Sequence, residues 1–543
     1  MARKLPAPWG SKHMNTRKLS PEFSVSPQVT PAELPAVAAL GFRAIICNRP
    51  DGEAQDQPSA ATMRDAAEGA RIGFAYVPVA TRDVSADDAR KMADALASLP
   101  GPVLAYCGSG ARAEAAWNAA QALRASAQGQ AVKIHDVVIV GGGSAGIATA
   151  ASLLKRRAGL DIALIEPADV HYYQPGWTMV GAGVFEPQST CRPMSQVMPE
   201  GVKWIKTAAV GFAPLENRVI LADGSDISYR VLIVASGIRL AWEAIPGLLE
   251  ALGRNGVTSN YRFDLAPYTN RLTAELKSGR AIFTQPPMPI KCAGAPQKAM
   301  YLSCDRWLKA GTLKNISVEF DNAGAVLFGV AAYVPALMSY IERYNIQLNF
   351  ETKLVKVDGE ARVASFERKG ANGPEIVERA FDILHAVPPQ VAPDCVRNSP
   401  LAAASGFVAV DEATLQNPTY PNVFALGDAC DAATAKTAAA ARQQAPVVAV
   451  NVLAQLEDKP PAAAYDGYGS CPLTVERGRI VLAEFGYGGK LMPTFPTWLL
   501  DGTKPTRAAW FLKDQMLPLI YWQGMLKGRE WLARPKPVAS VKS

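Results

Sequence analysis

The chain has 543 residues, 49% of them hydrophobic and 19% charged, which is the composition of a globular protein with core material for several domains. The formal net charge of +7 is small for this length and no dense run of lysine and arginine stands out, so composition argues against nucleic acid as a partner. Eight cysteines in so long a chain do not indicate a secreted disulfide framework, and no metal site is predicted. The sequence has neither a long apolar stretch nor an apolar signal core, so we expect a cytoplasmic protein with no spanning helix.

Residues 1–14 are interpreted as a leader or tag and are set aside, with Met14 as a candidate natural start. Residues 15–127 then alternate apolar runs with amphipathic stretches, which predicts a small α/β domain. Its predicted strands are 44–47, 74–79 and 102–106, and its predicted helices are 86–98, with Ser85 as N-cap, and 113–125.

A cysteine lies at the turn between the last of these strands and the helix after it, in the sequence Cys107-Gly-Ser-Gly-Ala-Arg112. Backbone N–H groups and the helix dipole at such a turn lower a thiol pKa and bind an anion, and Arg112 closes the loop. Four residues between the cysteine and the arginine is the spacing of rhodanese-type sulfurtransferases, whereas typical tyrosine phosphatases have five. The alternative is a buried structural cysteine beside an unrelated arginine.

With ICNRPDGE and YCGSGAR both present, this domain resembles the phosphatase-like domain of the beta-lactamase-hydrolase-like family, which occurs fused to sulfur-metabolism enzymes. The resemblance implies a phosphatase-type α/β fold with Cys107 as nucleophile and Arg112 as anion clamp. Asp51, within the first motif, is a candidate general acid. The family has Ser or Thr after the closing arginine, where this chain has Ala113, so a non-catalytic anion-binding module stays open as an alternative.

After a short polar linker, 126–133, the sequence KIHDVVIVGGGSAG joins an apolar strand at 137–140 to a glycine-rich turn and a helix. Such glycines let the backbone approach a dinucleotide pyrophosphate, and the helix N-terminus supplies N–H groups. A second strand, 162–165, ends at an acid placed to bind both ribose hydroxyls. The predicted cofactor-binding residues here are Gly141, Gly143, Ser144, Ala145, Gly146 and Glu166.

Two later segments indicate FAD rather than NAD. The strand 231–235 ends in Ser-Gly, where the chain would leave the nucleotide-binding domain. The segment 420–428 ends in Gly-Asp, where an aspartate would bind the ribityl chain of a flavin, and a helix follows at 438–451 whose N-terminus would face the flavin ring. The residues predicted from these segments are Ser236, Gly237, Gly427, Asp428, Lys436 and Thr437.

A second nucleotide-binding-like lobe is predicted at about residues 240–390. The run ISVEF, 316–320, is its expected strand, but the DNAGAVLFG that follows lacks GxGxxG. We therefore expect a lobe that kept its fold and lost a nicotinamide site, so that electrons enter from something other than NAD(P)H. An NADH:quinone oxidoreductase is the alternative function for this part of the chain.

The cysteines offer another source of electrons. Cys292 lies in PIKCAGAPQK, where Lys291 and Lys298 favour the reactive thiolate, and Cys471 lies far away in YDGYGSCPL. Cys430 is the next candidate for a redox cysteine, because it follows the Gly-Asp pair and could lie near a flavin. The other cysteines are expected to be small structural residues.

With KCAGAPQKAMYLS, HYYQPGWTMVGAG, AKTAAAAR and YDGYGSCPL all present, residues 133–535 resemble the mitochondrial-type sulfide:quinone oxidoreductases. The resemblance implies that Cys292 and Cys471 are a redox pair beside the flavin. Sulfide would open their bridge and leave a persulfide on Cys471, while the Cys292 thiolate forms a charge-transfer complex with FAD. Electrons would pass to ubiquinone, and the sulfane sulfur to a small thiol or to sulfite. Lys298 is a candidate stabiliser of the thiolate.

The C-terminal segment, 506–534, combines aromatic and aliphatic residues with interleaved lysines and arginines, and Pro518 interrupts the run. It is too short and too charged to span a bilayer, and this composition suits an interfacial amphipathic anchor. A docking helix or a homodimer face is the alternative.

The sequence thus predicts an α/β protein: an N-terminal phosphatase-like domain joined to a flavoprotein with two dinucleotide-binding domains of the Rossmann type and C-terminal membrane-contact helices. We expect sulfide oxidation with FAD as cofactor and ubiquinone as acceptor, on the cytoplasmic face of an inner membrane. Cys107 is expected to transfer the sulfane sulfur. The alternative is a phosphatase or an anion-binding module in that domain.

Overall fold

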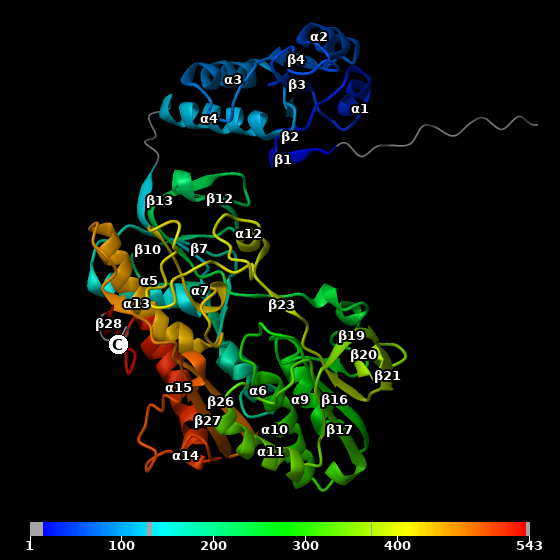
Figure 1. Ribbon diagram of the computed structural model, residues 1–543, viewed down its shortest axis with the longest axis vertical. Helices are drawn as coiled ribbons and strands as arrows, with labels where there is room; N and C mark the ends of the chain where they lie inside the picture. The colour runs from blue at the N-terminus through cyan, green and yellow to red at the C-terminus, as the bar shows by residue number, and fades with distance from the viewer. Residues whose placement is uncertain (1–14, 128–132, 371, 539–543) are drawn as a thin grey trace, which may run out of the picture. The chain divides into compact units, whose positions relative to one another are not determined.

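The computed structural model describes residues 15–127, 133–370 and 372–538 (Figure 1). The chain divides into two compact units, one running to Lys133 and the other comprising Ile134–Ala222 and the residues from Asp226 on. The predicted leader and most of the predicted linker lie outside the described residues.

The first unit is built on a five-stranded sheet in the order β1-β2-β5-β3-β4, parallel except for the β1–β2 hairpin. Alternate residues of β3 and β5 face opposite sides, so Ile46 and Ala105 pack on α3 and α4 while Ile45 and Leu104 pack on α1 and α2. The strands are β1 Arg17–Ser20, β2 Phe23–Ser26, β3 Ala44–Cys47, β4 Gly73–Tyr76 and β5 Val103–Tyr106. The helices are α1 Leu34–Ala39, α2 Ala60–Gly69, α3 Ala86–Ser98 and α4 Ala111–Ala127.

Local sequence determines much of this unit. The Ser85 hydroxyl caps α3 by accepting a hydrogen bond from the Asp88 N–H at 3.1 Å, as predicted. The strand predicted at 44–47 and the helix at 86–98 are confirmed at both ends. Because β5 is followed directly by α4, the Cys107 loop lies at the carboxyl end of a buried parallel sheet, where α/β folds place their sites.

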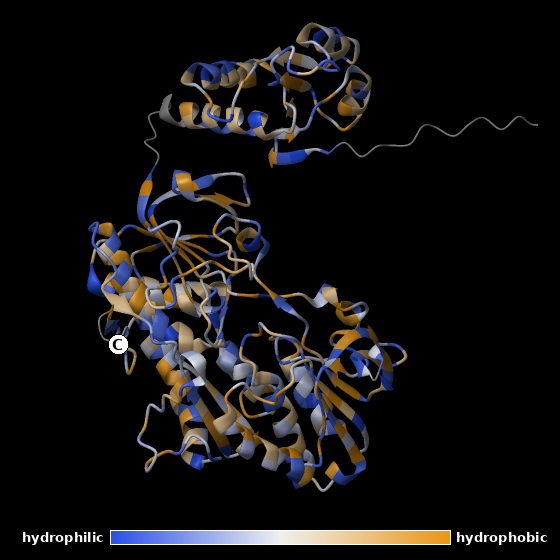
Figure 2. Ribbon diagram, viewed as in Figure 1, coloured by the Kyte–Doolittle hydropathy of each residue, from blue (hydrophilic) through white to orange (hydrophobic). Residues whose placement is uncertain are grey.

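The second unit has two lobes. In the first lobe, parallel strands β10, β7, β6, β13 and β24 form a sheet that antiparallel β12 and β11 extend. Helices α5 and α13 pack together against it, and the central strands are uniformly apolar (Figure 2). Its elements are β6 Ile134–Val140, α5 Ser144–Arg156, β7 Ile162–Ile165, β10 Val202–Ile205, β11 Ala209–Ala213, β12 Arg218–Leu221, β13 Asp226–Val234, β24 Val423–Ala425 and α13 Ala438–Leu456.

The second lobe has its own parallel sheet, in the order β15-β22-β16-β17-β18, and an antiparallel sheet β19-β20-β21. The parallel sheet comprises β15 Val257–Thr258, β16 Gly279–Gln285, β17 Ile316–Asn322, β18 Gln347–Asn349 and β22 Ile383–His385, with α9 Ala266–Glu275, α10 Ala295–Lys309 and α11 Val334–Arg343. The antiparallel sheet comprises β19 Thr352–Asp358, β20 Val363–Gly370 and β21 Gly373–Ala380. The antiparallel pair β14 Arg239–Leu240 and β23 Gln390–Val391 joins the lobes, as Figure 1 shows for β23.

One assignment within this lobe was wrong. The run 316–320 lies in β17, which is the second strand of the β16–α10–β17 unit and not the first. A glycine fingerprint would therefore follow β16, and the turn there is PPMPIKCAGA, which holds Cys292 and also lacks GxGxxG. The cysteine takes the position in which a dinucleotide-binding domain has its phosphate-binding turn.

The C-terminal segment is helical from Arg507 to Lys527 and continues through Pro518, contrary to the expected interruption. Proline lacks an N–H, and the backbone adapts with π-helical turns at Leu512–Met516 and Ile520–Gly524 on either side of it. Leu517 accordingly donates to the Leu512 carbonyl, five residues back. In Figure 1 this segment, with α14 Arg507–Phe511 and α15 Leu517–Leu519, lies beside the hairpin of β26 Gly469–Glu476 and β27 Arg479–Phe485. None of the described helices is long and apolar enough to cross a bilayer.

Candidate functional site

The glycine-rich turn between β6 and α5 brings backbone segments into close contact. A Cβ at Gly141, whose φ is +109°, would lie 2.4 Å from the Ala235 carbonyl oxygen, and one at Gly146 would lie 1.9 Å from the Gly141 oxygen. Both positions therefore exclude any larger residue. A Cβ at Gly143 would meet nothing within 4 Å, so space is open in front of the helix N-terminus.

This turn fits the diphosphate of FAD. Gly143 is the N-cap of α5 and no side chain caps the helix, so its first N–H groups and its dipole are available to an anion. Glu166, at the end of β7, accepts hydrogen bonds from the Gly142 and Ala168 N–H groups at 2.7 and 2.8 Å, which hold its carboxylate beside the turn. The buried Ser236 hydroxyl has no hydrogen-bond partner among the described residues, and a bound group would satisfy it.

The Gly-Asp segment after β24 lies close to the N-terminus of α13. Thr437 caps that helix by accepting from the Ala440 N–H at 3.1 Å. The Lys436 ammonium donates to the carbonyls of Asp428 and Cys430 at 3.0 and 2.8 Å. Burial raises the pKa of Asp428, and nearby Lys291 and Lys436 oppose that shift. These residues surround the position in which a flavin ring would meet the helix N-terminus.

A hydrogen-bonded chain connects the glycine turn to the C-terminal segment. His171 Nδ1 lies 3.1 Å from the Gly142 carbonyl oxygen, which can only accept, so Nδ1 carries the proton and Nε2 is an acceptor. Burial lowers the pKa of His171 to about 4, so the ring is neutral at pH 7. The Tyr521 hydroxyl therefore donates to Nε2 at 2.6 Å and accepts from the Ser144 hydroxyl at 2.7 Å. Only the Ser144 backbone N–H then remains for the cofactor.

The structure brings Cys292 and Cys471 together, with their sulfur atoms 3.6 Å apart. Cys292 lies in the turn after β16 and Cys471 in β26, and the Cys292 N–H donates to the Lys436 carbonyl at 2.8 Å, next to the start of α13. Gly294 permits this approach, since a Cβ there would lie 2.6 Å from the Cys471 sulfur. Cys292 adopts a φ of 49°, a strained conformation for a residue other than glycine.

Lys298, from the first turn of α10, donates from its ammonium to Cys292 Sγ at 3.1 Å. The hydrogen bond from Cys471, together with the charge and hydrogen bond of Lys298, lowers the pKa of Cys292 well below its usual range against the effect of burial. The hydrogen bond to Cys292 and burial raise the pKa of Cys471 well above its usual range. Cys292 is therefore the thiolate of the pair, and Cys471 keeps its proton.

Sequence reasoning missed a second lysine at this site. Lys513, in the π-helical turn of the C-terminal segment, is 2% exposed, and its ammonium donates to the Pro175 carbonyl at 2.7 Å. Burial lowers the pKa of Lys513 to about 7, and the charge of Lys298 adds to this shift. Its charge also helps to lower the pKa of Cys292. The residues next to Lys513 in the sequence do not indicate a site residue, because only the fold brings this lysine close to the cysteine pair.

Cys430 is not part of this arrangement. Its sulfur donates to the Gly427 carbonyl at 3.3 Å, and burial raises the pKa of its thiol. The pKa values of Cys47, Cys304 and Cys395 are raised by burial in the same way.

The Cys107 loop in the first unit forms a ring of N–H groups around its sulfur. Cys107 Sγ accepts from the Gly110 N–H at 3.1 Å, and the thiol has no exposed surface. Burial disfavours ionisation, but the N–H groups of Ala113, Ser109, Arg112 and Gly110 outweigh it and lower the pKa of Cys107. The loop is thus able to hold a thiolate.

The carboxylate of Asp51 lies at the start of α2. Its Oδ1 accepts a hydrogen bond from the Ala60 N–H at 2.8 Å, at the first residue of α2. The acid that contacts the loop is Glu53, which binds Arg112 through two N–H···O contacts, of 2.5 and 2.7 Å. Arg49 contacts the same carboxylate at 3.1 Å. Sequence reasoning missed Glu53 and Arg49, although both lie in the ICNRPDGE motif.

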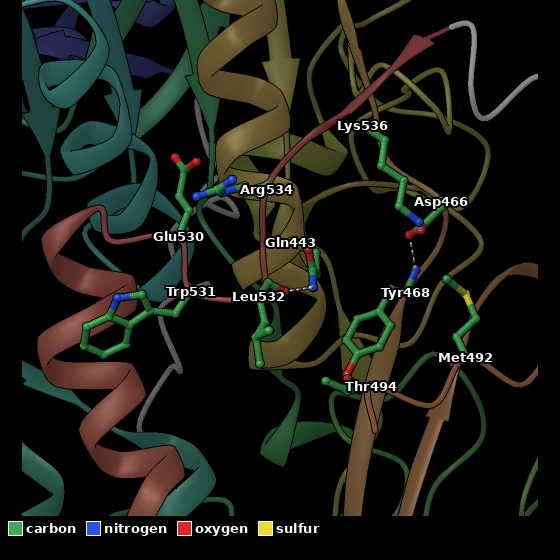
Figure 3. A pocket seen from close by; sticks show the side chains of 10 residues that line it. All are labelled: Gln443, Asp466, Tyr468, Met492, Thr494, Glu530, Trp531, Leu532, Arg534 and Lys536. Carbon is green, nitrogen blue, oxygen red and sulfur yellow. Dashed lines mark hydrogen bonds and ion pairs between the residues drawn. The ribbon is translucent and has the colours of Figure 1, made fainter. Parts of the chain in front are cut away.

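A pocket of about 700 Å³ lies where the end of the C-terminal segment meets β26 and α13 (Figure 3). Its lining includes Glu530, Arg534, Lys536 and Asp466, and Lys536 forms an ion pair with Asp466. Four charged side chains suit a polar ligand or water better than a quinone, so we assign it no part in electron transfer.

The fold and these sites define a flavoprotein of the disulfide oxidoreductase class with an added Cys-loop unit. The family model for pyridine nucleotide-disulphide oxidoreductases matches residues 135–273, and that for the phosphatase-like domain of beta-lactamase hydrolase-like proteins matches residues 15–124. The mitochondrial sulfide:quinone oxidoreductase of Dictyostelium discoideum is 40% identical over 406 residues, covering 74% of this chain and 88% of that protein. The chain belongs to the sulfide:quinone oxidoreductase family, and its cofactor is FAD with a quinone as electron acceptor.

Two further comparisons concern the fold of the second unit and the sequence of the first. The crystal structure of the Aquifex aeolicus sulfide:quinone oxidoreductase superposes with a TM-score of 0.59 at 20% identity, covering 72% of this chain and 91% of that one, and shows the shared fold. The beta-lactamase hydrolase-like protein of Agrobacterium fabrum is 32% identical over 100 residues, which cover 18% of this chain and 23% of that protein.

Proposed function

We propose that the second unit oxidises sulfide at the Cys292–Cys471 pair. The observation that carries this proposal is the pair itself: two sulfur atoms 3.6 Å apart, one of which accepts a hydrogen bond from Lys298. A modest movement would bring the sulfur atoms to the roughly 2.05 Å of a disulfide.

The difference in pKa supports different roles for the two sulfur atoms. In the oxidised pair, HS⁻ attacks Cys471 Sγ, a new S–S bond makes Cys471 a persulfide, and the Cys471–Cys292 bond breaks with its electron pair on Cys292. Attack in this direction is favoured because the thiol of lower pKa is the better leaving group. Lys298 then stabilises the Cys292 thiolate. Bound FAD supplies the two-electron redox chemistry that connects this pair to the quinone.

We propose ubiquinone as the acceptor, reached at a membrane surface on the cytoplasmic face of an inner membrane. The C-terminal segment supports this with large apolar side chains that the second unit leaves exposed: Phe511 at 58%, Leu519 at 49% and Leu532 at 66%. Lysine and arginine side chains lie between them in the sequence, as an interfacial anchor requires.

We further propose that Cys107 accepts the sulfane sulfur as a persulfide and passes it on. The lowered pKa of Cys107 and its ring of N–H groups support a carrier of this kind. Ala113 lacks the hydroxyl that helps a thiolate leave in a phosphatase, which favours sulfur transfer over phosphate hydrolysis.

The activity of the second unit is tested by sulfide-dependent reduction of a short-chain ubiquinone. Cys292→Ser and Cys471→Ser should each abolish it, while Cys395→Ser is the matched control and should retain it. Reduction of the enzyme by NADH in place of sulfide would instead support the NADH:quinone alternative. For the first unit, unchanged sulfur transfer to small acceptors in Cys107→Ser would eliminate the carrier role.

A further inference from the structure

Glu53 bridges two arginines beside the Cys107 loop. Its carboxylate is bound by the two terminal nitrogens of Arg112 and by Nε of Arg49. Both guanidinium groups flank the residue that follows the cysteine, because a Cβ at Gly108 would lie 3.9 Å from Arg112 Nη2 and from Arg49 Nε. Two positive charges and one negative charge therefore meet at the edge of a loop whose N–H groups surround Cys107.

The two arginines do not depend on Glu53 for their positions. Arg112 Nη1 also donates to the carbonyl oxygens of Val79 and Ala80, at 2.9 and 3.2 Å. Arg49 Nη1 donates to the Gln28 side-chain oxygen at 2.8 Å. Removal of the Glu53 carboxylate would leave both guanidinium groups anchored, with unused donors directed at the space that it occupies.

Glu53 is more exposed than its two partners. It lies in a stretch of turns and bends between β3 and α2, and its side chain is 30% exposed, against 16% for Arg112 and 17% for Arg49. A carboxylate on such a loop is able to swing out when a stronger anion arrives. The site without it carries two positive charges, which suits a dianion better than a single carboxylate.

We propose that Arg49 and Arg112 form a binding site for a small sulfur oxyanion of the sulfite class, and that Glu53 occupies this site until the ligand displaces it. The proposal rests on the proposed role of Cys107 as a sulfur carrier and names its acceptor. A thiol group itself would use neither guanidinium, whereas an oxyanion would bind through both and lie at the edge of the loop that carries Cys107.

The transfer step balances without a further oxidant. The sulfur lone pair of sulfite attacks the outer sulfur of the Cys107 persulfide and a new S–S bond gives thiosulfate. The bond between that outer sulfur and Cys107 Sγ breaks, and its electron pair stays on Sγ as a thiolate. The N–H group of Gly110 and its neighbours in the loop then stabilise this thiolate.

Sulfate, an unreactive oxyanion of similar shape, is the probe for this site. In the full-length, FAD-loaded protein, sulfate should protect Cys107 from iodoacetamide, as followed by mass spectrometry of the Cys107 peptide. Glu53→Gln should lower the sulfate concentration for half-protection about tenfold, since the competing charge is gone. The double variant Glu53→Gln, Arg49→Gln should need a higher sulfate concentration for half-protection than Glu53→Gln alone, by a similar factor. Glu68→Gln and Arg90→Gln change the charge of the same unit elsewhere and should have no effect.

Three results would overturn the proposal. An unchanged half-protection concentration in Glu53→Gln would show that Glu53 does not compete for the site. A raised concentration would show that Glu53 positions the arginines for the ligand. If acetate protected Cys107 as well as sulfate does, the site would bind carboxylates and not sulfur oxyanions in particular. If Cys107 resists alkylation in every form, calorimetric titration with sulfate gives the same comparison among the variants.

Failure of the proposed carrier role of Cys107 can be distinguished from failure of the proposed anion site. Cys107→Ser retains Arg49 and Arg112 and should still bind sulfate by calorimetry. Normal sulfate binding with unchanged sulfur transfer in that variant would eliminate the carrier role but leave the anion site intact.

Discussion

The Lys298 ammonium lies 3.1 Å from Cys292 Sγ. After the hydrogen bond from Cys471, the charge and hydrogen bond of Lys298 are the main causes that lower the pKa of this thiol. Lys298 is only 4% exposed, so water does little to screen its charge. Burial alone would lower the pKa of Lys298, but the charge of Cys292 and the other interactions with the two cysteines together outweigh burial and raise it, so the lysine stays protonated. Each group thus stabilises the charged form of the other.

Lys298→Met should raise the pKa of the Cys292 thiol, because the buried cation is lost. The measurement is the pH profile of Cys292 alkylation in a Cys471→Ser background, where no disulfide forms. Lys298→Arg keeps the charge and should recover part of the shift. A profile that does not move in Lys298→Met would show that the lysine does not set the reactivity of Cys292.

Lys513 should give the stability of the second unit a characteristic pH dependence. Its pKa is about 7 in the folded protein and about 10.4 in an unfolded chain. Between these values the unfolded chain binds more protons, so wild-type stability should rise with pH relative to Lys513→Met, by up to about 1.4 kcal/mol per pH unit. The difference should be constant below about pH 7. Melting curves from pH 6 to 9 test this, with exposed Lys527→Met as control, and parallel curves for wild type and Lys513→Met would contradict it.

Tyr521→Phe should destabilise the second unit by about 1–3 kcal/mol, since it leaves His171 Nε2 buried without a donor. It should also make the C-terminal segment more sensitive to proteolysis and speed the loss of FAD, because the segment loses its bond to the glycine turn at Ser144. Tyr229→Phe is the matched control: that hydroxyl is buried with no hydrogen-bond partner among the described residues, so its removal should be nearly neutral. Equal effects of the two variants would contradict a specific role for Tyr521.

Those strands and helices whose formation depends on residues close together in the chain were predicted well from the sequence. The strands 44–47 and 162–165 and the helix 86–98 are confirmed residue by residue, since short apolar runs and a serine cap determine them locally. The glycine turn followed from the same kind of pattern. The strand order within the second lobe could not be predicted in this way. Only the pairing of β17 with β16 shows that β17 is the second strand of its β–α–β unit and not the first.

Contacts between distant parts of the chain could not be predicted. Lys513 looked like one of several basic residues on an interfacial helix, yet it is buried against Pro175, 338 residues away. The bond between Tyr521 and Ser144 spans 377 residues. Sequence reasoning singled out Asp51 in a motif that also holds Glu53, and only the fold directs Asp51 to α2 and Glu53 to Arg112.

The most direct test of the central claim is an anaerobic titration of the FAD-loaded protein with sulfide, followed by its visible spectrum and then by addition of a short-chain ubiquinone. The account predicts a long-wavelength charge-transfer band and bleaching of the flavin, with recovery of the oxidised spectrum on addition of quinone. Cys292→Ser should lose the band, and Cys471→Ser should not be reduced by sulfide. A flavin that sulfide leaves unbleached in the wild type, or that sulfide reduces equally well in Cys471→Ser, would contradict the assignment of the cysteine pair.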